Sequence, residues 1–412
     1  MIPFSPPRID DLIINEVVDT LKSGWITTGP KTLRLENEIK DYTGASAVVC
    51  LNSATAGLEL VLRWYGVKPG DEVIIPAYTY CATANVVEHI GAVPVFVDVN
   101  PNDFNIDIQA IEKAITNRTK VIMPVDIAGL PCDYEAVNNL VIRPDVLQKF
   151  KAETEEQQKL GRILIMADAA HSFGASVNGV KQGRLTDVAV FSFHAVKNLT
   201  TAEGGAIAFN LNVERFIPEV LTKRFKVLSL HGQSKDAFSK LKPGAWRYDV
   251  EVAGFKCNMT DIQASIGLVE LSRYDNDTLV RRKQICDQYH SLFSQHSDLF
   301  ELPLFVDEKR QSCYHLYQLR VKNISENQRD EIITRISELG VSVNVHFIPV
   351  PMLSYYKEKG YSISNYPVAY RNFSQEISLP VYYDLSPEQV KIVFDAVLNS
   401  VQNVLATNET TV

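Results

Sequence analysis

The chain has 412 residues, of which 46% are hydrophobic and 22% are charged. This is the composition of a globular protein with room for two domains, and the formal net charge of -8 at pH 7 argues against nucleic acid or an anionic membrane as a partner. No apolar run reaches the ~20 residues of a membrane helix, and the N-terminus has no basic region followed by a long apolar one, so we expect neither a membrane span nor a signal peptide.

Six cysteines are spread along the chain, and no two of them form a C-x-x-C pair. That spacing indicates neither a zinc knuckle nor a redox-active dithiol, and we expect no metal site. Several of the cysteines stand in apolar stretches, where a reduced thiol behaves as a small hydrophobic residue. Reduced thiols are typical of the cytoplasm, so we expect a cytoplasmic protein.

The first expected elements are an amphipathic helix over residues 9–22, which a glycine ends, and an apolar strand over residues 47–51. A second helix starts directly after that strand, and Ser53 stands at its N-cap position. Its simplest role is to cap the helix. The free N–H groups and the positive dipole of a helix amino end also suit an anion, so the sequence predicts a phosphate site here.

The next apolar strand, residues 72–76, leads into a segment that carries Tyr78 and Tyr80. An aromatic ring at the end of a strand usually packs in the core. It can also stack on a flat ligand, and a stacked aromatic pair contributes about 0.5–1.5 kcal/mol beyond burial. Residues 93–98 and 120–125 read as two further strands, with helical spacing over residues 105–115 between them.

Two later strands end in residues that can do chemistry. Residues 163–168 form an apolar run that ends at Asp168, with His171 three positions on, and residues 188–192 form another that ends at Ser192. Lys197 follows in a loop rich in hydroxyl groups and glycine, directly before an apolar strand over residues 206–209. Lysines mostly lie on solvated loops, but a lysine in a partly dry site can lose its proton and form a Schiff base with a carbonyl.

These runs make seven apolar strands, most of them separated by helical segments, which predicts an α/β fold with a mostly parallel seven-stranded sheet. In such sheets ligands bind outside the carboxyl ends of the strands. We therefore expect Asp168, His171, Ser192 and Lys197 to meet at one edge. An aspartate, a lysine and a phosphate cradle together form the set of groups that pyridoxal phosphate needs.

The last part of the chain predicts a smaller α+β domain. Residues 318–321 and 341–345 read as strands, and residues 326–339 read as a helix. A capping box, Ser386-Pro-Glu-Gln389, opens the final helix. We expect a large domain over residues 1–264, a small domain over residues 265–405 and a disordered tail over residues 406–412.

The ordered motifs Asp168-Ala-Ala-His171 and Ser192-Phe-His-Ala-Val-Lys197 resemble those of the DegT–DnrJ–StrS family of sugar aminotransferases. The resemblance runs from about residue 3 to about residue 401, and it implies the aspartate-aminotransferase fold, called fold type I, with pyridoxal 5'-phosphate as cofactor. The chain departs from the family pattern near residues 141–160, where it carries an insertion whose polar residues we expect on a solvated helical face.

The resemblance implies a role for each candidate. Lys197 holds the cofactor covalently and moves the substrate proton, Asp168 pairs with the pyridine nitrogen, and His171 bonds the phenolic oxygen. Ser192, together with Ser53, Ala54 and Thr55, binds the phosphate. Tyr80 stacks on the ring, with Tyr78 as the fallback. The loop around Thr200, Thr201 and residues 203–205 supports Lys197.

Other family positions fall farther from this motif. Either Lys256 or Asn258 is expected to cross a homodimer interface to the phosphate of the partner, so the active sites would lie between subunits. Trp25, Thr28, His315 and His346 are the substrate candidates. The alternative is a structural role, because a polar residue in such a loop and a histidine beside a strand are usually structural.

One further position differs from the family. Asp126 stands where many relatives have a histidine, and the sequence leaves open whether this changes the substrate or only a hydrogen bond.

The implied reaction is transfer of an amino group, with glutamate as donor, to the keto group of a nucleotide-linked sugar. A UDP-4-keto-6-deoxy sugar used for a surface polysaccharide or glycoconjugate is the first choice. The alternatives are a keto-sugar dehydratase, a non-catalytic sensor or regulator that carries the cofactor, and a pyridoxal-dependent lyase of amino acids. Known dehydratases of this kind have histidine in place of the lysine, so Lys197 argues against the first alternative.

Overall fold

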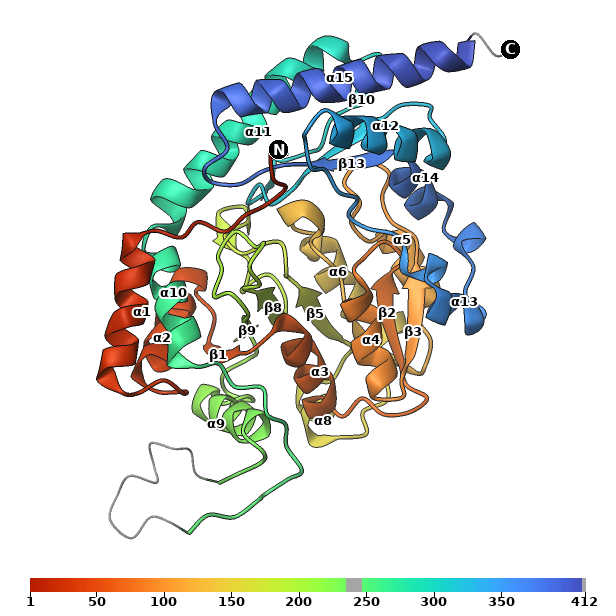
Figure 1. Ribbon diagram of the computed structural model, residues 1–412. Helices are drawn as coiled ribbons and strands as arrows, with labels where there is room; N and C mark the ends of the chain where they lie inside the picture. Colours follow the sequence, from red (N-terminus) through yellow and green to blue (C-terminus); the bar gives the residue numbers. More distant parts are fainter. Residues whose placement is uncertain (235–246, 410–412) are drawn as a thin grey trace.

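The computed structural model describes residues 1–234 and 247–409, and a central sheet of seven strands organises it (Figure 1). The strands lie in the order β1-β9-β8-β5-β4-β2-β3. Their bounds are β1 Ala47–Leu51, β2 Glu72–Pro76, β3 Val93–Val97, β4 Thr119–Ile122, β5 Leu164–Asp168, β8 Val188–Ser192 and β9 Gly205–Phe209. The prediction of an α/β fold with a mostly parallel seven-stranded sheet is confirmed; β9 alone runs antiparallel to both of its neighbours.

Alternation along the strands explains why helices cover both faces of this sheet. Successive side chains of a strand point to opposite faces, and in β8 Val188 and Val190 belong to one core while Ala189 and Phe191 belong to the other. Nearly every residue of these strands is buried. A sheet that is apolar on both faces has to be covered on both, as parallel sheets are.

The first face is covered by helices from three parts of the chain. These are α3 Ala54–Trp64, α4 Cys81–His89 and α9 Pro218–Ser229, whose apolar residues join one core with the sheet. The second face is covered by α2 Pro30–Thr43, α5 Ile108–Ala114, α6 Tyr134–Val141 and α10 Asp261–Ser272. Helix α1, Asp11–Ser23, packs on α10 and ends at Gly24 as expected, with a left-handed φ of 73°.

Most polar residues of the insertion are exposed, as expected, but they do not share the face of one continuous helix. The insertion forms two short helices, α7 Pro144–Leu147 and α8 Glu155–Leu160, joined by an irregular segment. Gln157 of α8 is fully buried and donates from Nε2 to the Tyr65 carbonyl at 2.9 Å. A polar side chain thus anchors the segment to the end of α3, because a buried amide has to find a partner.

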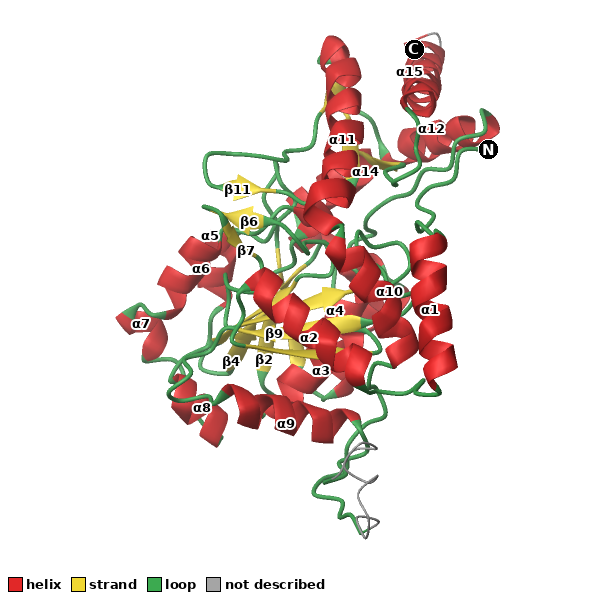
Figure 2. Ribbon diagram, turned by 90° about the vertical axis from the view of Figure 1, so that its left-hand side faces the viewer, coloured by secondary structure: helices red, strands yellow, loops and turns green. Residues whose placement is uncertain are grey.

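The C-terminal part builds a second core around a three-stranded sheet, β10 Phe300–Glu301, β12 Tyr317–Val321 and β13 Glu376–Leu379. Helices α11 Leu279–Phe293, α12 Glu326–Glu338 and α15 Pro387–Glu409 pack on it. Figure 2 shows these three helices together at one end of the molecule, far from α9. Within the described residues, no helix is both long and apolar enough to span a bilayer.

Two expectations for this part need correction. Residues 341–345 are not a strand, since only single bridges, Val341 to Ile2 and Asn344 to Ser378, pair them. Helix α15 starts at the expected capping box, where the Ser386 N–H donates to Gln389 at 2.9 Å. It continues to Glu409, so residues 406–409 are helical, while residues 410–412 lie outside the described part. The boundary near residue 265 stays a prediction.

Short elements connect these parts. A small sheet joins β6 Ser176–Val177, β7 Val180–Lys181 and β11 Arg310–Gln311. The remaining helices are α13 Ser354–Glu358 and α14 Pro367–Gln375, with single turns η1 Ile127–Gly129, η3 Tyr274–Thr278, η4 Ser294–His296, η5 Val350–Met352 and η6 Ile363–Asn365.

Candidate active site

A cavity of about 350 Å³ lies at the carboxyl edge of the central sheet, where β5 and β8 end. The sequence-predicted candidates meet here as expected for an α/β sheet. Ten of them line its wall: Ser53, Ala54, Thr55, Tyr80, Asp168, His171, Ser192, Lys197, His315 and His346.

Lys197 reaches this cavity from a loop that the backbone and two hydroxyls hold closed. The Lys197 N–H donates to His194 at 2.9 Å, and the Thr201 N–H donates to Phe193 at 2.8 Å. Thr200 and Thr201 are buried and bond within the loop, which agrees with a supporting position. Burial lowers the pKa of Lys197 to about 8, and the charge of Asp168 opposes that shift.

Asp168 lies at the end of β5 and is 6% exposed. Its Oδ2 accepts from Thr83 Oγ1 at 2.8 Å, and its Oδ1 accepts from the Ala170 N–H at 3.3 Å. Burial raises the pKa of this carboxyl, while the Thr83 bond, the Ala170 N–H and the charge of Lys197 counteract the rise. No arginine bonds to Asp168 within the described residues, so it remains able to pair with a charged ligand atom.

His171 is buried beside this carboxyl, and its Nδ1 has no partner among the described residues. Its ring lies against Phe347 at 5.5 Å between centroids, and against His315 at 4.3 Å. Burial and then the charge of Lys197 hold the pKa of His171 well below its usual value. An unpaired buried polar atom is costly, which indicates that a ligand supplies the missing bond.

The first turn of α3 forms the opposite wall, and Ser53 caps it as predicted. Its Oγ accepts from the Ala56 N–H at 3.1 Å, and no acceptor among the described residues bonds to the N–H groups of Ala54 and Thr55. A Cβ on Gly205 would lie 2.5 Å from the Ala54 nitrogen, so only glycine lets β9 begin this close to the turn. Together with Ser192 these groups form a cradle that fits a phosphate.

The two tyrosines separate clearly. Tyr80 lines the cavity, is 59% exposed and lies 5.6 Å from the Phe347 ring. Tyr78 is fully buried, packs on Phe104, and donates its hydroxyl to the His346 carbonyl. Tyr80 therefore has the free ring face that a stacking role needs, and the fallback Tyr78 does not.

The C-terminal part supplies the remaining wall through His315 and His346. Asn198 donates from its amide to the Cys313 carbonyl at 2.8 Å, so its Oδ1 accepts from Nδ1 of His315, also at 2.8 Å. Nε2 of His315 is then left as an acceptor. Nδ1 of His346 lies 2.9 Å from the Ser378 hydroxyl, and burial lowers the pKa of His346 to about 3. Both imidazoles are neutral at physiological pH.

Four candidates do not line the cavity. Trp25 donates from its indole to the Thr28 carbonyl at 3.0 Å, and Asn258 donates to the Thr28 hydroxyl at 2.6 Å. Lys256 is exposed and bonds to Asn258. These four residues form one cluster beyond the end of β1, where Leu51 bridges Asn258. None of the four is among the residues that line the cavity with Lys197.

Four residues of the site were not predicted from the sequence. Thr83 bonds Asp168, and its spacing of one helical turn from Thr79 was the available signal, since the two hydroxyls lie 2.8 Å apart. Asn198, next to Lys197, fixes the His315 ring. Phe347 and Phe4 complete the wall, and Phe4 stacks on His346 at 5.4 Å. Nothing in the sequence near Phe4 indicates that contact.

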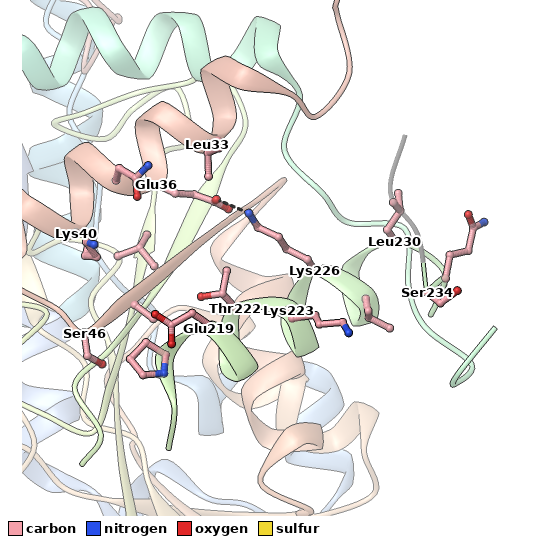
Figure 3. Close-up of a pocket in the computed structure, with 16 residues that line it drawn as sticks. Leu33, Glu36, Lys40, Ser46, Glu219, Thr222, Lys223, Lys226, Leu230 and Ser234 are labelled. Atoms are coloured by element: carbon pink, nitrogen blue, oxygen red, sulfur yellow. Dashed lines mark ion pairs between the residues drawn. The ribbon is translucent and has the colours of Figure 1, made fainter. Parts of the chain in front are cut away.

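A second hollow, of about 440 Å³, lies between α2, the start of β1 and α9 (Figure 3). None of the predicted residues lines it. Lys226 and the buried Glu36 form an ion pair across it at 2.8 Å. Glu36 also accepts from the Cys50 N–H at 3.1 Å, so this pair holds α9 on the sheet. Both charges are already satisfied, which argues for a structural pair.

The groups around the 350 Å³ cavity fit pyridoxal phosphate. They supply an amine of lowered pKa, a carboxyl with no cationic partner among the described residues, an orphaned imidazole nitrogen and a helix amino end for the phosphate. This fold with this site defines a fold-type-I pyridoxal-phosphate transferase.

Comparisons with known proteins agree. Residues 7–398 match the DegT/DnrJ/EryC1/StrS aminotransferase family. The spore coat polysaccharide biosynthesis protein SpsC of Bacillus subtilis is 37% identical, with 97% of both chains covered. The PMP form of the putative sugar aminotransferase Spr1654 of Streptococcus pneumoniae superimposes with a TM-score of 0.94 at 46% identity, over 98% of this chain and all of that one. Spr1654 is also known in a PLP form.

A relative from Shewanella sediminis, 36% identical with 98% of both chains covered, is a UDP-4-amino-4-deoxy-L-arabinose–oxoglutarate aminotransferase. The chain belongs to the DegT/DnrJ/EryC1/StrS family and is a pyridoxal-phosphate-dependent sugar aminotransferase. The alternatives of a non-catalytic regulator and an amino-acid lyase are therefore wrong.

Proposed function

We propose that this aminotransferase moves the amino group of glutamate to the keto group of a nucleotide-linked sugar, with a UDP-4-keto-6-deoxy sugar as first choice. The observation that carries the proposal is the convergence of Lys197 and Asp168 on one cavity beside the amino end of α3. The Shewanella relative, named for a UDP-sugar and oxoglutarate, supports the substrate class. SpsC, named for spore coat polysaccharide biosynthesis, supports a role in surface glycoconjugate synthesis.

Lys197 is the catalytic residue of this proposal. Bound pyridoxal phosphate supplies an electron sink for the carbon that loses its proton. Lys197 Nζ would hold the cofactor, and its free neutral amine would serve as the base that takes this proton and the acid that gives it back. A pKa of about 8 leaves a useful fraction of neutral amine near pH 7, which a base needs.

Asp168 keeps a positive charge at the ring nitrogen. Two opposite charges ~4 Å apart attract by about 4 kcal/mol at an effective dielectric of ~20, before desolvation is counted. Thr83 holds the carboxylate by its Oδ2, and Oδ1 has only the weak bond from the Ala170 N–H. With the cofactor bound, its phosphate would be held at the α3 amino end by Ser53, Ala54, Thr55 and Ser192. Tyr80 would stack on the ring, and His171 would bond the phenolic oxygen.

Neutral imidazoles favour an uncharged, hydroxylated group, such as the sugar ring of the proposed substrate. His315 offers an acceptor at Nε2, and His346 lies across the same cavity. No arginine is present among the described residues that line the cavity. Sugar hydroxyls both donate and accept, so a pyranose ring suits these partners.

The cluster of Trp25, Thr28, Lys256 and Asn258 fits a role across a homodimer interface. Because it does not line the cavity that holds Lys197 in its own chain, we propose that Lys256 or Asn258 contacts the phosphate in the partner, and that Trp25 and Thr28 lie near the partner's substrate. A mixture of Lys197→Ala and Asn258→Ala subunits tests this. Restored activity supports a shared site, and inactive mixtures that exchange subunits contradict it.

The experiment for the whole proposal is a panel of UDP-, dTDP- and GDP-linked 4-keto-6-deoxy sugars, each incubated with glutamate and read by product mass. The proposal expects the amino sugar and 2-oxoglutarate in equal amounts, fastest with a UDP-linked substrate. Loss of water from the sugar without amine would indicate a dehydratase. No amine product with any sugar would contradict the proposed substrate class.

A further inference from the structure

Asp126 is a buried carboxylate next to the site that no step above uses. It follows Val125, whose backbone bridges Asp168, and it has no exposed surface. It does not line the cavity. Its effect on the reaction therefore has to pass through other residues.

Four donors surround this side chain. Oδ1 accepts from the Cys132 N–H at 2.9 Å and from the Tyr134 hydroxyl at 2.7 Å. Oδ2 accepts from the Ser172 hydroxyl at 2.6 Å and from the Gln182 amide. Burial raises the pKa of Asp126, and the bonds from Ser172, Tyr134, Cys132 and Gln182 oppose the rise. A carboxylate with four donors is an acceptor only, so an amide in its place leaves at least one donor facing another donor.

The backbone and side chain of Asp126 hold both ends of the segment that carries Asp168 and His171. At one end, the Asp126 N–H donates to the Asp168 carbonyl at 3.2 Å, and the Asp168 N–H donates to Pro124 at 2.9 Å. At the other end, Oδ2 of Asp126 holds Ser172, which directly follows His171. Five residues that include the acid and the orphaned imidazole are thus held by the backbone of residue 126 at one end and by its carboxylate at the other.

We propose that Asp126 is a positioning residue that sets the places of Asp168 and His171 against the cofactor. The proposal rests on the roles proposed for these two residues. It also answers the question that the sequence leaves open at this position, because Asp126 acts on hydrogen bonds behind the cofactor and contacts no substrate. A displacement of about 1 Å at such a site can cost on the order of 100-fold in rate.

Asp126→Asn tests the proposal, with Asp187→Asn as the matched control. Asp187 is a buried aspartate directly before β8, at the opposite end of β5 from Asp168, where it accepts from Arg162 at 2.7 Å. For each protein, the cofactor Kd is measured by titration with pyridoxal phosphate, and the midpoint pH of the visible absorbance change is measured on the loaded protein. The Tm is measured on the apo form.

We expect Asp126→Asn to raise the cofactor Kd about tenfold or more and to shift the absorbance midpoint by about half a pH unit or more. Asp187→Asn is expected to lower Tm at least as much as Asp126→Asn does. It should leave the cofactor Kd within twofold of the parent value and the absorbance midpoint unchanged. If Asp126→Asn lowers Tm but leaves Kd and the absorbance midpoint unchanged, the positioning role is overturned.

Two milder variants keep the test decisive if Asp126→Asn does not fold. Ser172→Ala removes the donor that lies in the His171 segment, and Tyr134→Phe removes a donor that lies outside it. The proposal expects the absorbance midpoint to move more in Ser172→Ala than in Tyr134→Phe. Equal or reversed shifts would overturn it. Cofactor attachment to Lys197 in the parent is measured separately by borohydride trapping, so a failure of the proposed roles is recognised on its own.

Discussion

Two buried aspartates at opposite ends of β5 and β8 have different surroundings. Asp187, just before β8, accepts two bonds from Arg162 and a third from the Ile165 N–H at 2.9 Å. Asp168, at the end of β5, bonds one threonine hydroxyl and one N–H and faces a cavity with Lys197. A fully paired carboxylate stabilises the fold, whereas a buried one without a cation is ready to bind one from a ligand.

The largest effect is expected at the amine that shares the cavity with Asp168. Lys197→Ala removes both the covalent anchor and the base, so turnover is expected to fall by more than about 10³-fold. Product mass with the preferred keto sugar and glutamate measures it. Amination at the parental rate would mean that Lys197 has no catalytic role.

The same aspartate-to-asparagine change at Asp168 and at Asp187 tests whether the two carboxylates differ in role. Asp168→Asn removes a charge interaction of about 4 kcal/mol, and kcat is expected to fall about 10²–10³-fold with little change in Tm. Asp187→Asn is expected to lose about 2–4 kcal/mol of unfolding free energy and to keep kcat within twofold. Urea unfolding and initial rates decide, and a loss of kcat in Asp187→Asn equal to that in Asp168→Asn would remove the distinction.

The pH at which Lys197 reacts is the next test. Its pKa is lowered from 10.5 to about 8 in the folded chain, so the neutral, reactive fraction rises with pH up to about 8. The rate at which the apo protein captures pyridoxal phosphate is expected to fall about tenfold per pH unit below pH 8. Stopped-flow absorbance measures it, and a rate still rising tenfold per unit above pH 9 would contradict the lowered pKa.

A smaller effect is expected from the partner of Asp168. Thr83→Val keeps the shape of the side chain but removes the hydroxyl that bonds Oδ2. A hydrogen bond to a charged group contributes about 1.5–3 kcal/mol, so the cofactor Kd is expected to rise about tenfold. Fluorescence titration with pyridoxal phosphate measures the change. An unchanged Kd would show that Asp168 does not need this bond, and Thr83→Ser is the control that restores the donor.

Sequence alone predicted the central sheet because its strands are strongly apolar and most of them are followed by a helix. Lys197 and Asp168 were found for the same reason, since both stand at strand ends where ligands bind. The Ser53 cap was also predicted, because capping depends on residues close in the chain. Local rules of this kind carry over directly to the structure.

Long-range packing set the limits of that prediction. Most polar residues of the insertion are exposed, as expected, but the burial of Gln157 depends on a carbonyl at Tyr65, 92 positions away, and no local pattern indicates it. Residues 341–345 look like a strand, but β10 and β13 lie on the two sides of β12, and residues 341–345 make only a single bridge to β13. The contact of Phe4 with His346 joins the N-terminal segment to the C-terminal part of the chain, and no local pattern indicates it.

The most direct measurement is borohydride reduction of the purified protein with pyridoxal phosphate, followed by peptide mass mapping. We expect a single reduced pyridoxyl group on Lys197, and none when Lys197 is replaced by alanine. A pyridoxyl group on another lysine, or its retention in the alanine variant, would contradict the central claim that this amine at the edge of the sheet holds the cofactor.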